Sequence, residues 1–355
     1  MDQKFTCQSY RNLCKQIFQA FGFSEPDSLQ ISEVLLMADL FGVESHGISR
    51  IMKYYRLLKN GIVNVHAIPE KLFETGISAV YDAKSGMGQI AGTLAMREAI
   101  KKAKENGIGL IEVRNANHYG IAGYYALMAA EEGMIGVSMT NTEAIMVPTF
   151  SAQALLGSNP IAIAVPTGGV PFLYDGATTV ITRGKLELYK KLGKQLPYDW
   201  AVDENGEISH DPEQVLTCIS SKRGGGILPV GGAGEDQGGY KGYSYALICE
   251  IFTSVLAGGV PSMQKKELGD TSQCFYALDP GLFGNREETE KRMQQLLEEI
   301  HAAKRASNQP HIYTPGEKEF QRAQERKEHG IPVNEKTAEE LRQIVEMLGL
   351  KGTEL

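Results

Sequence analysis

The spacing of apolar residues changes near Pro69, and this change limits the folds open to the chain. From about Tyr10 to Lys59 the apolar residues recur with helical spacing, and Asn60-Gly61 ends this region. Beyond it, short apolar runs alternate with helical segments. We expect strands at 78–82, 110–113, 135–140, 161–165 and 172–174, with helices at 93–106 and up to residue 132. This alternation is typical of α/β or α+β proteins.

The C-terminal region returns to helical spacing. A charged amphipathic helix is expected at 286–304, and shorter helices at 320–328 and 337–348. Helices at both ends around a mixed centre predict an α/β fold in which an α/β lobe is inserted into a discontinuous helical lobe. The expected boundaries are 1–75 for the N-terminal helical part, 76–285 for the α/β lobe and 286–355 for the C-terminal helical part.

Three central segments carry further expectations. Asp203-Glu204-Asn205-Gly206 is expected to form a hairpin tip. Residues 222–242 are rich in glycine and are expected to form a loop. Residues 243–260 include Glu250 and several small polar residues, so they are expected to form a buried helix and not a membrane span.

Composition narrows the class of protein. The formal net charge is −7 without a basic tract, which argues against nucleic acid as the main partner. The N-terminus lacks a basic segment followed by an apolar one, so no signal peptide is expected. The five cysteines have no CxxC spacing and are odd in number, so we expect no zinc site and no disulfide framework. A cytoplasmic location fits such cysteine usage.

One stretch combines residue types that suit an anionic substrate. Ser45 is expected to cap a helix, and His46, Arg50 and Tyr54 then follow at intervals of four on one face. Arginine can hold a carboxylate with two hydrogen bonds, and histidine can transfer a proton near pH 7. The alternative is a solvated helix face with a capping histidine.

Polar clusters also stand where the expected strands end. His118 and Asn141 each follow a strand, Asp175 follows another, and Ser158 lies just before one. Together they predict one shared cleft, because α/β proteins place their chemistry at strand ends. Each has a simpler alternative: His118 as a structural histidine, and Asp175 as the cap of a following helix.

Two glycine-rich segments fail as nucleotide-binding fingerprints. Gly86-Met87-Gly88 precedes a third glycine, Gly92, that comes one place late, and a tight strand-to-helix turn is the better interpretation. The segment 232–241 lacks the Gly-Lys-Ser/Thr of a Walker loop, although it can still wrap an anion with Lys241. No HExxH or GxSxG motif is present.

Blocks in this order resemble the malate/L-lactate dehydrogenase family of the second type, which includes ureidoglycolate dehydrogenase, sulfolactate dehydrogenase and 2,3-diketo-L-gulonate reductase. The resemblance runs over nearly the whole chain. It rests on Glu44-Ser45-His46-Gly47 with Arg50, Tyr81-Asp82, Asn117-His118-Tyr119-Gly120, Thr140-Asn141, Leu156-Gly157-Ser158-Asn159-Pro160, Asp175-Gly176-Ala177-Thr178-Thr179, Arg183-Gly184-Lys185, Gly238-Gly239-Tyr240-Lys241-Gly242, Asp279-Pro280 and Pro315-Gly316-Glu317.

The resemblance implies a non-Rossmann NAD(P)-binding fold, a homodimer, and NAD or NADP as cofactor. It implies His46, oriented by Ser45, or else His118 as the acid/base. On the substrate side it implies Arg50, with Ser158, Arg183 and Lys185 nearby, and the spacing described above adds Tyr54 to this group. The implied cofactor contacts are His118, Tyr119, Gly120, Thr140, Asn141, Asp175, Gly176, Ala177, Thr178, Tyr240, Lys241, Pro315, Gly316 and Glu317.

The expected reaction is reversible hydride transfer between nicotinamide and C2 of a 2-oxo or 2-hydroxy acid, of the malate or L-lactate type. Alternatives within the family are ureidoglycolate, a sugar acid or a cyclic imino acid as substrate. An alternative of another class is a catalytically inactive sensor of a metabolite or cofactor.

Overall fold

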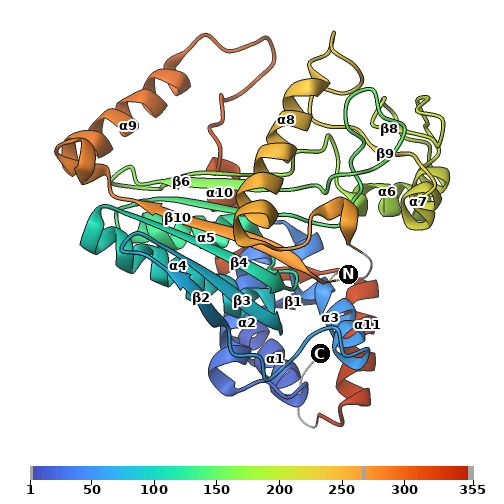
Figure 1. Cartoon of the computed structure of the whole chain (residues 1–355), viewed down its shortest axis with the longest axis horizontal. Helices are drawn as coiled ribbons and strands as arrows, with labels where there is room; N and C mark the ends of the chain where they lie inside the picture. Colours follow the sequence, from blue (N-terminus) through green and yellow to red (C-terminus); the bar gives the residue numbers. More distant parts are fainter. Residues whose placement is uncertain (1–2, 266–268, 351–355) are drawn as a thin grey trace.

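A seven-stranded sheet forms the centre of the molecule. The structure is a computed structural model that describes residues 3–265 and 269–350. The strand order is β2-β3-β4-β10-β5-β6-β7. The strands are β2 (Glu70–Glu74), β3 (Ser78–Gly86), β4 (Ile108–Ala116), β5 (Ile135–Thr140), β6 (Ile161–Val165), β7 (Phe172–Gly176) and β10 (Thr271–Leu278) (Figure 1).

The directions of the strands bring several chain segments to one edge of this sheet. Only β3 and β4 pair in parallel, and the other neighbours are antiparallel. As a result β3, β4, β5 and β7 run one way, while β2, β10 and β6 run the other way. The ends of the first set therefore lie at the same edge as the beginnings of β6 and β10. This explains how residues after one strand and before another can share a cleft.

Two helices cover one face of the sheet. They are α4 (Gly88–Asn106) and α5 (Ala122–Glu131). Gly109 and Gly136 allow this close packing, because a Cβ at either would lie about 2 Å from a helix carbonyl oxygen, that of Ala99 or Ala126. Helix α4 begins five residues before the predicted start, because Gly88 lies directly against the backbone of residues 117–118.

Helices from the two ends of the chain pack together below this layer. They are α1 (Cys7–Ala20), α2 (Glu25–Leu40) and α3 (Ile51–Lys59) from the N-terminal part, with α10 (Glu317–His329) and α11 (Glu335–Met347) from the C-terminal part. Strand β1 (Gln3–Phe5) pairs with β11 (Ile331–Val333), which fixes the two ends side by side. The predicted α/β fold with a discontinuous helical part is confirmed. The numbered boundaries at 75 and 285 remain predictions.

A small subregion with its own core was not predicted. It contains α6 (Arg183–Lys191), α7 (Pro212–Ser221) and the strand pair β8 (Ala201–Val202) and β9 (Gly226–Ile227). Its apolar core includes Leu186, Val215 and Ile227. The predicted turn at 203–206 is present, with the Gly206 N–H donating to the Asp203 carbonyl at 3.0 Å. Residues 222–242, which were predicted to form a glycine-rich loop, contain β9 and the first residues of the next helix, which begins at Gly239.

The segment predicted as a buried helix is helical but only half buried. Helix α8 (Gly239–Glu250) continues into a π-helical turn, η3 (Ile251–Val255), on the sheet face opposite α4 and α5. Its inner side buries Cys249, Glu250 and Thr253, whereas its outer side exposes apolar residues. The helix was predicted correctly, but its complete burial was not, because apolar side chains cover both sides of this helix and only one side has a neighbour in this chain.

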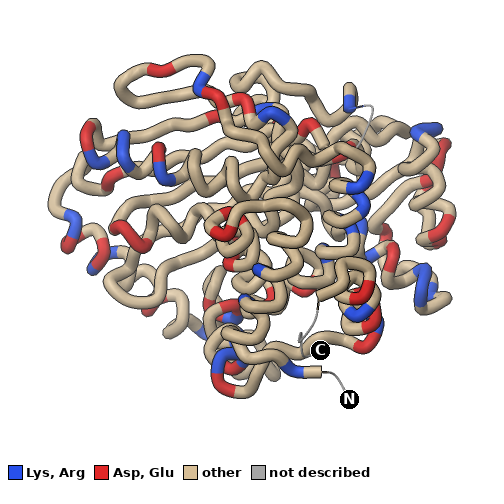
Figure 2. Tube along the Cα trace, turned by 90° about the horizontal axis from the view of Figure 1, so that it is seen from below, with Lys and Arg blue, Asp and Glu red and all other residues tan. Residues whose placement is uncertain are grey.

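Helix α9 (Arg286–Ala302) has no buried residue and stands away from the sheet (Figure 1). Acidic and basic residues are mixed along the trace (Figure 2). Within residues 3–265 and 269–350, no helix has both the length and the apolar character that a membrane crossing requires.

Candidate active site

The stretch that carries His46 is not the helix predicted from its spacing. Two 3-10 turns, at Glu44–His46 and Ile48–Arg50, precede α3, so Ser45 caps no helix. The chain is held by the buried Asp39, which accepts hydrogen bonds from the Ile48 N–H at 2.8 Å and from the Tyr10 hydroxyl. Gly47 is required here, since a Cβ would lie 2.1 Å from the Asp39 carboxylate. The prediction that one helix begins at Ser45 and carries His46, Arg50 and Tyr54 on one face is therefore wrong.

Tertiary structure nevertheless brings the predicted side chains together. The rings of His46 and His118 stack with centroids 5.3 Å apart and planes at 29°. Ser45 Oγ lies 2.9 Å from His46 Nδ1, so Ser45 orients this ring by a direct hydrogen bond. The Arg50 guanidinium donates a hydrogen bond from Nε to the Ser45 carbonyl oxygen, which fixes its position.

A chain of hydrogen bonds fixes the ring of His118. Gln89 Nε2 donates to the Tyr54 hydroxyl oxygen at 2.9 Å, and that hydroxyl lies 2.8 Å from His118 Nδ1. The Gly120 N–H also points at Nδ1, at 3.4 Å. Because Tyr54 accepts from Gln89, its own proton is free for Nδ1. Two donors at Nδ1 place the proton of the neutral ring on Nε2.

The local electrostatics keep both imidazoles neutral. Burial, together with the nearby charges of Arg50 and Lys53, lowers the pKa of His46 to about 3. Burial, Arg50 and His46 lower the pKa of His118 well below its ordinary value. At neutral pH each ring therefore presents an uncharged face to its surroundings.

A cavity of about 180 Å³ lies against these residues and is rich in cations. Its charged lining consists of Arg50, Lys53, Arg183 and Glu143. Arg183 contacts Glu143 at 3.4 Å. The lining carries a formal excess of two positive charges, which suits a small anion of matching charge.

A second cavity, of about 310 Å³, shares His46, Ser158 and Thr182 with the first. Apolar side chains form much of its wall, and the turns at Gly120 and at Pro315-Gly316 complete it. This combination of apolar walls and exposed backbone fits a planar ring and a ribose, so the residues present fit a nicotinamide cofactor. The two cavities meet at His46.

Asp175 borders the second cavity and also stabilises a helix. It accepts a hydrogen bond from the Gly123 N–H at 2.7 Å, in the first turn of α5. Although Asp175 is accessible to solvent at the cavity wall, desolvation by the surrounding protein raises its pKa to about 6, opposed by this hydrogen bond. It therefore caps α5, which precedes it in the chain, and not the following helix α6.

Several predicted site residues support the cavities from beneath. Tyr119 is buried and stacks on Tyr125, with ring centroids 4.8 Å apart. Thr140 and Asn141 are buried, and Asn141 bonds Glu250 and Lys265. Thr178 Oγ1 donates to the Ser158 carbonyl at 2.9 Å. Gly176 lies between Asp175 and Ala177, both of which line the second cavity.

Other predicted residues lie outside both cavities in this chain. Lys185 is exposed, with its Nζ 5.7 Å from the centre of the Tyr189 ring. Tyr240 and Lys241 are exposed at the start of α8. The side chain of Glu317 points to His301 and His311, although Pro315 and Gly316 line the second cavity.

Sequence reasoning missed residues that the structure places in the site. Lys53 lines the first cavity and stands only three positions after Arg50, so helical spacing offered a signal for it. Gln89 follows the strand-to-helix turn at Gly86 and reaches the site only because α4 packs beneath Tyr54. Glu143 and Thr182 gave no signal in the sequence.

Comparison with known proteins identifies the family of this chain. Residues 5–342 match the family described as malate/L-lactate dehydrogenase. The chain belongs to this family. It is 41% identical over 344 residues to a malate dehydrogenase of Pyrococcus abyssi, covering 96% of this chain and 93% of that protein. It is 36% identical over 350 residues to an L-sulfolactate dehydrogenase of Methanocaldococcus jannaschii, covering 97% and 96%.

Solved structures share the whole fold. A malate dehydrogenase crystal structure from Entamoeba histolytica superposes with a TM-score of 0.94 at 30% identity, covering 99% of each chain. The malate dehydrogenase of Pyrococcus horikoshii gives 0.89 at 38% identity, covering 99% of this chain and 97% of that one. The protein is thus a malate dehydrogenase-like 2-hydroxy acid dehydrogenase, and this family membership implies a nicotinamide cofactor.

Proposed function

We propose that the protein reversibly oxidises a dianionic 2-hydroxy acid, malate in the first place, to its 2-oxo acid with NAD or NADP. The observation that carries this proposal is the charge of the first cavity, where three cations face one carboxylate. A dicarboxylate compensates the excess of two positive charges, whereas a monocarboxylate such as lactate leaves one cation unmatched.

The cations take distinct roles in this proposal. Arg50 holds the carboxylate next to C2, because it lies beside the imidazoles and its guanidinium can form two parallel hydrogen bonds. Lys53 faces the second acidic group of the substrate. Arg183 is already paired with Glu143 at 3.4 Å and with Glu187 at 3.2 Å, so it contributes less net charge than Lys53 does.

His46 is the proposed acid/base. During oxidation the C2 carbon loses a hydride and the hydroxyl oxygen loses a proton. His46 Nε2 is free to accept that proton when Nδ1–H donates to Ser45 Oγ. His118 carries its proton on Nε2 and can only donate there, so it is proposed to orient the substrate oxygen or the cofactor.

The second cavity is the proposed cofactor site. When bound, nicotinamide supplies the hydride acceptor or donor. Gly120, Ala122, Pro315 and Gly316 would hold it by backbone and van der Waals contact, and Asp175 by its carboxylate. The remaining predicted cofactor contacts, from Thr140 to Lys241, remain part of this proposal.

A homodimer is proposed on the outer side of α8. Tyr245 and Ile248 on α8 and Val255 on the continuing turn η3 form an exposed stripe at helical spacing, and Val255 is 59% exposed. Exposed apolar stripes of this kind mark protein interfaces. A partner on this face would also approach Tyr240 and Lys241, which lie one turn earlier.

The substrate proposal is tested by a kinetic panel. Oxaloacetate, sulfopyruvate, pyruvate and 2,3-diketogulonate are reduced with NADH and with NADPH, and ureidoglycolate is oxidised with both oxidised cofactors. We expect kcat/KM for the dianions to exceed that for pyruvate by about 10²-fold, the discrimination typical of a buried charge pair. Binding of NADH without turnover of any acid would instead indicate a sensor.

The Lys53→Met variant separates the two carboxylate sites. It is expected to lower kcat/KM for oxaloacetate by about 10²-fold and to leave pyruvate almost unchanged. Arg50→Met is the matched control, because it should lower kcat/KM for both acids by roughly 10²-fold or more. Equal losses for both acids in Lys53→Met would contradict a role specific to the second acidic group.

A further inference from the structure

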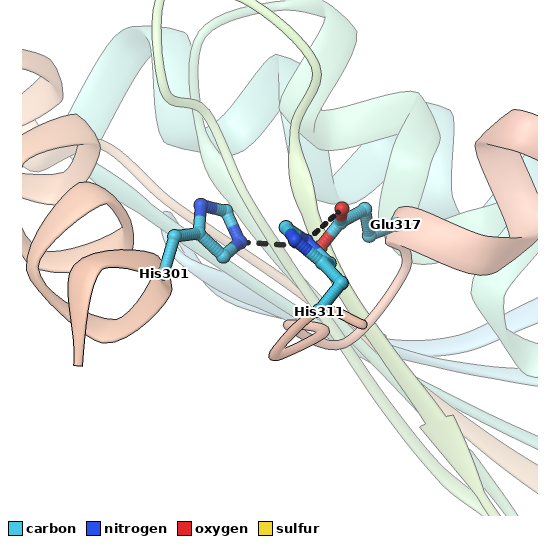
Figure 3. Close-up of side chains that lie close together, drawn as sticks. All are labelled: His301, His311 and Glu317. Atoms are coloured by element: carbon cyan, nitrogen blue, oxygen red, sulfur yellow. Dashed lines mark hydrogen bonds and ion pairs between the residues drawn. The ribbon is translucent and has the colours of Figure 1, made fainter. Parts of the chain in front are cut away.

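Three side chains able to bind a metal converge outside the active site. His301 comes from the last turn of α9, His311 from the connection that follows, and Glu317 from the first position of α10 (Figure 3). Their ligand atoms all lie within 4.8 Å of one another. In the part of the chain that the structure describes, no other group of three or more histidine, cysteine or acidic residues meets this condition.

Both imidazoles lie within hydrogen-bonding distance of the same carboxylate, that of Glu317. His301 Nε2 lies 3.1 Å from Glu317 Oε2, and His311 Nε2 lies 2.7 Å from Oε1. The Thr314 N–H donates to Oε2 at 3.1 Å, which fixes the carboxylate. The two rings lie 5.0 Å apart at their centroids, and one ligand atom of each of the three residues lies within 4.8 Å of the other two.

These residue types and separations match zinc. Two imidazole nitrogens and one carboxylate oxygen are a common zinc ligand set, with bonds of about 2.0–2.2 Å. Ligand atoms at such bond lengths around a tetrahedral ion are about 3.3 Å apart. The two separations from an imidazole Nε2 to a Glu317 oxygen, 3.1 and 2.7 Å, are at or somewhat below this value, and all three ligand atoms lie within 4.8 Å of one another. Small rotations of these half-buried side chains would bring them to bonding distance of one ion. Three protein ligands leave a fourth position for water.

We propose that His301, His311 and Glu317 together bind one Zn²⁺ ion. Each imidazole would carry its proton on Nδ1 and offer Nε2 to the ion. The absence of cysteine pairs and of an HExxH motif led us to expect no metal. These three residues match no local metal-binding motif, because they are 10 and 6 positions apart and belong to three different segments.

The ion would connect an otherwise loosely attached helix to the cofactor cavity. Helix α9 buries no residue of its own. Glu317 follows directly on Pro315 and Gly316, which line the second cavity, and the Pro315 carbonyl accepts from the Leu173 N–H at 3.3 Å. Zn²⁺ at Glu317 would therefore hold the end of α9 and stiffen this turn at the same time.

The test uses the full chain after treatment with EDTA. It is titrated with Co²⁺, whose absorption reports tetrahedral coordination, and with Zn²⁺ by calorimetry. We expect one ion per chain, with His301→Gln and His311→Gln each weakening affinity by about 10-fold or more. His66→Gln is the control, because His66 is exposed and lies outside the cluster. Saturating Zn²⁺ should raise Tm by about 3 °C in the wild type and in this control only.

Both readouts are independent of catalysis, so failure of the proposed activity would not affect them. Absence of Co²⁺ and Zn²⁺ binding would overturn the proposal. Binding that both variants retain would also overturn it, since the ion would then be held elsewhere, for example by His46 and His118. Circular dichroism of each variant verifies that the fold is intact.

Discussion

At the scale of single residues, the two active-site histidines differ in what faces Nδ1. His118 Nδ1 receives two donors, Tyr54 and the Gly120 N–H, whereas His46 Nδ1 faces the Ser45 hydroxyl alone. A hydroxyl can accept as well as donate, so only His46 can present an unprotonated Nε2 to the substrate. The sequence identified both residues but left their roles open, because tautomers depend on contacts between segments distant in the chain.

This difference predicts the pH dependence of oxidation. Because the pKa of His46 is lowered to about 3, the neutral base persists on acidification, and kcat/KM should stay flat from about pH 8 to pH 5. Lys53→Met removes a neighbouring cation and so should raise that pKa and move the acidic limb upward. His46→Gln should lower kcat/KM by roughly 10²-fold or more at every pH in this range.

His118→Gln serves as the comparison variant in these profiles. It should lower the rate without changing the shape of the pH profile, because His118 only donates a hydrogen bond. If an inflection near pH 6.5 is present and disappears in His118→Gln but not in His46→Gln, then the base is His118.

At the scale of elements, α8 depends on one buried carboxylate. Glu250 is 3% exposed and accepts hydrogen bonds from Asn141, Asn159, Ser254 and Ser262. Burial opposes its ionisation, but the hydrogen bonds from Asn141, Ser262 and Asn159 outweigh this and lower the pKa of Glu250. This carboxylate links α8 to the ends of β5 and to the start of β6.

Glu250→Gln is therefore expected to destabilise the protein by about 3 kcal/mol, because an amide N–H₂ would face donors that need an acceptor. Since the pKa in the folded state is below its unfolded value, the stabilisation is present at neutral pH and is lost as pH falls through the folded-state pKa. Urea unfolding at pH 7 and at pH 4 measures both effects.

The control for this variant is Glu287→Gln on the exposed helix α9. Its free energy of unfolding should change by less than about 0.5 kcal/mol. Equal midpoints for Glu250→Gln and Glu287→Gln would show that the buried network contributes no net stability.

The elements also show what local sequence can and cannot predict. The bounds of β5 and β6 agree with the prediction residue for residue, because their apolar runs are short and flanked by turn residues. The helix expected from Ser45 failed because Asp39, on another helix, binds Ile48 and leaves no room at Gly47 for a side chain. Similarly, Asp175 caps a helix that precedes it by about 50 positions. Such long-range contacts leave no local pattern.

At the scale of the whole molecule, the order of strands decides where the site forms. The sequence predicted that polar clusters at strand ends share a cleft, and the common direction of β4, β5 and β7 explains why His118 and Asp175 border adjoining cavities. Strand order itself could not be predicted, since β10 enters the sheet from a position more than 100 residues beyond its neighbours.

The whole-molecule prediction concerns assembly. Ile248→Asp combined with Val255→Asp places two charges in the exposed stripe of α8 and should convert the proposed dimer to a monomer. Light scattering coupled to gel filtration measures the mass. Phe150→Asp is the matched control, because Phe150 is 82% exposed in a loop outside this stripe and its replacement should leave the mass unchanged. A wild type that is monomeric at micromolar concentration would contradict the dimer.

The place of β10 has a consequence for biosynthesis. This strand lies between β4 and β5, yet it is translated long after both of them. On the ribosome, β4 and β5 must wait with open edges until residue 278 has left the exit tunnel, which favours slow folding and exposes the nascent chain to aggregation. Chaperones that shield these edges during translation should therefore raise the yield of active protein.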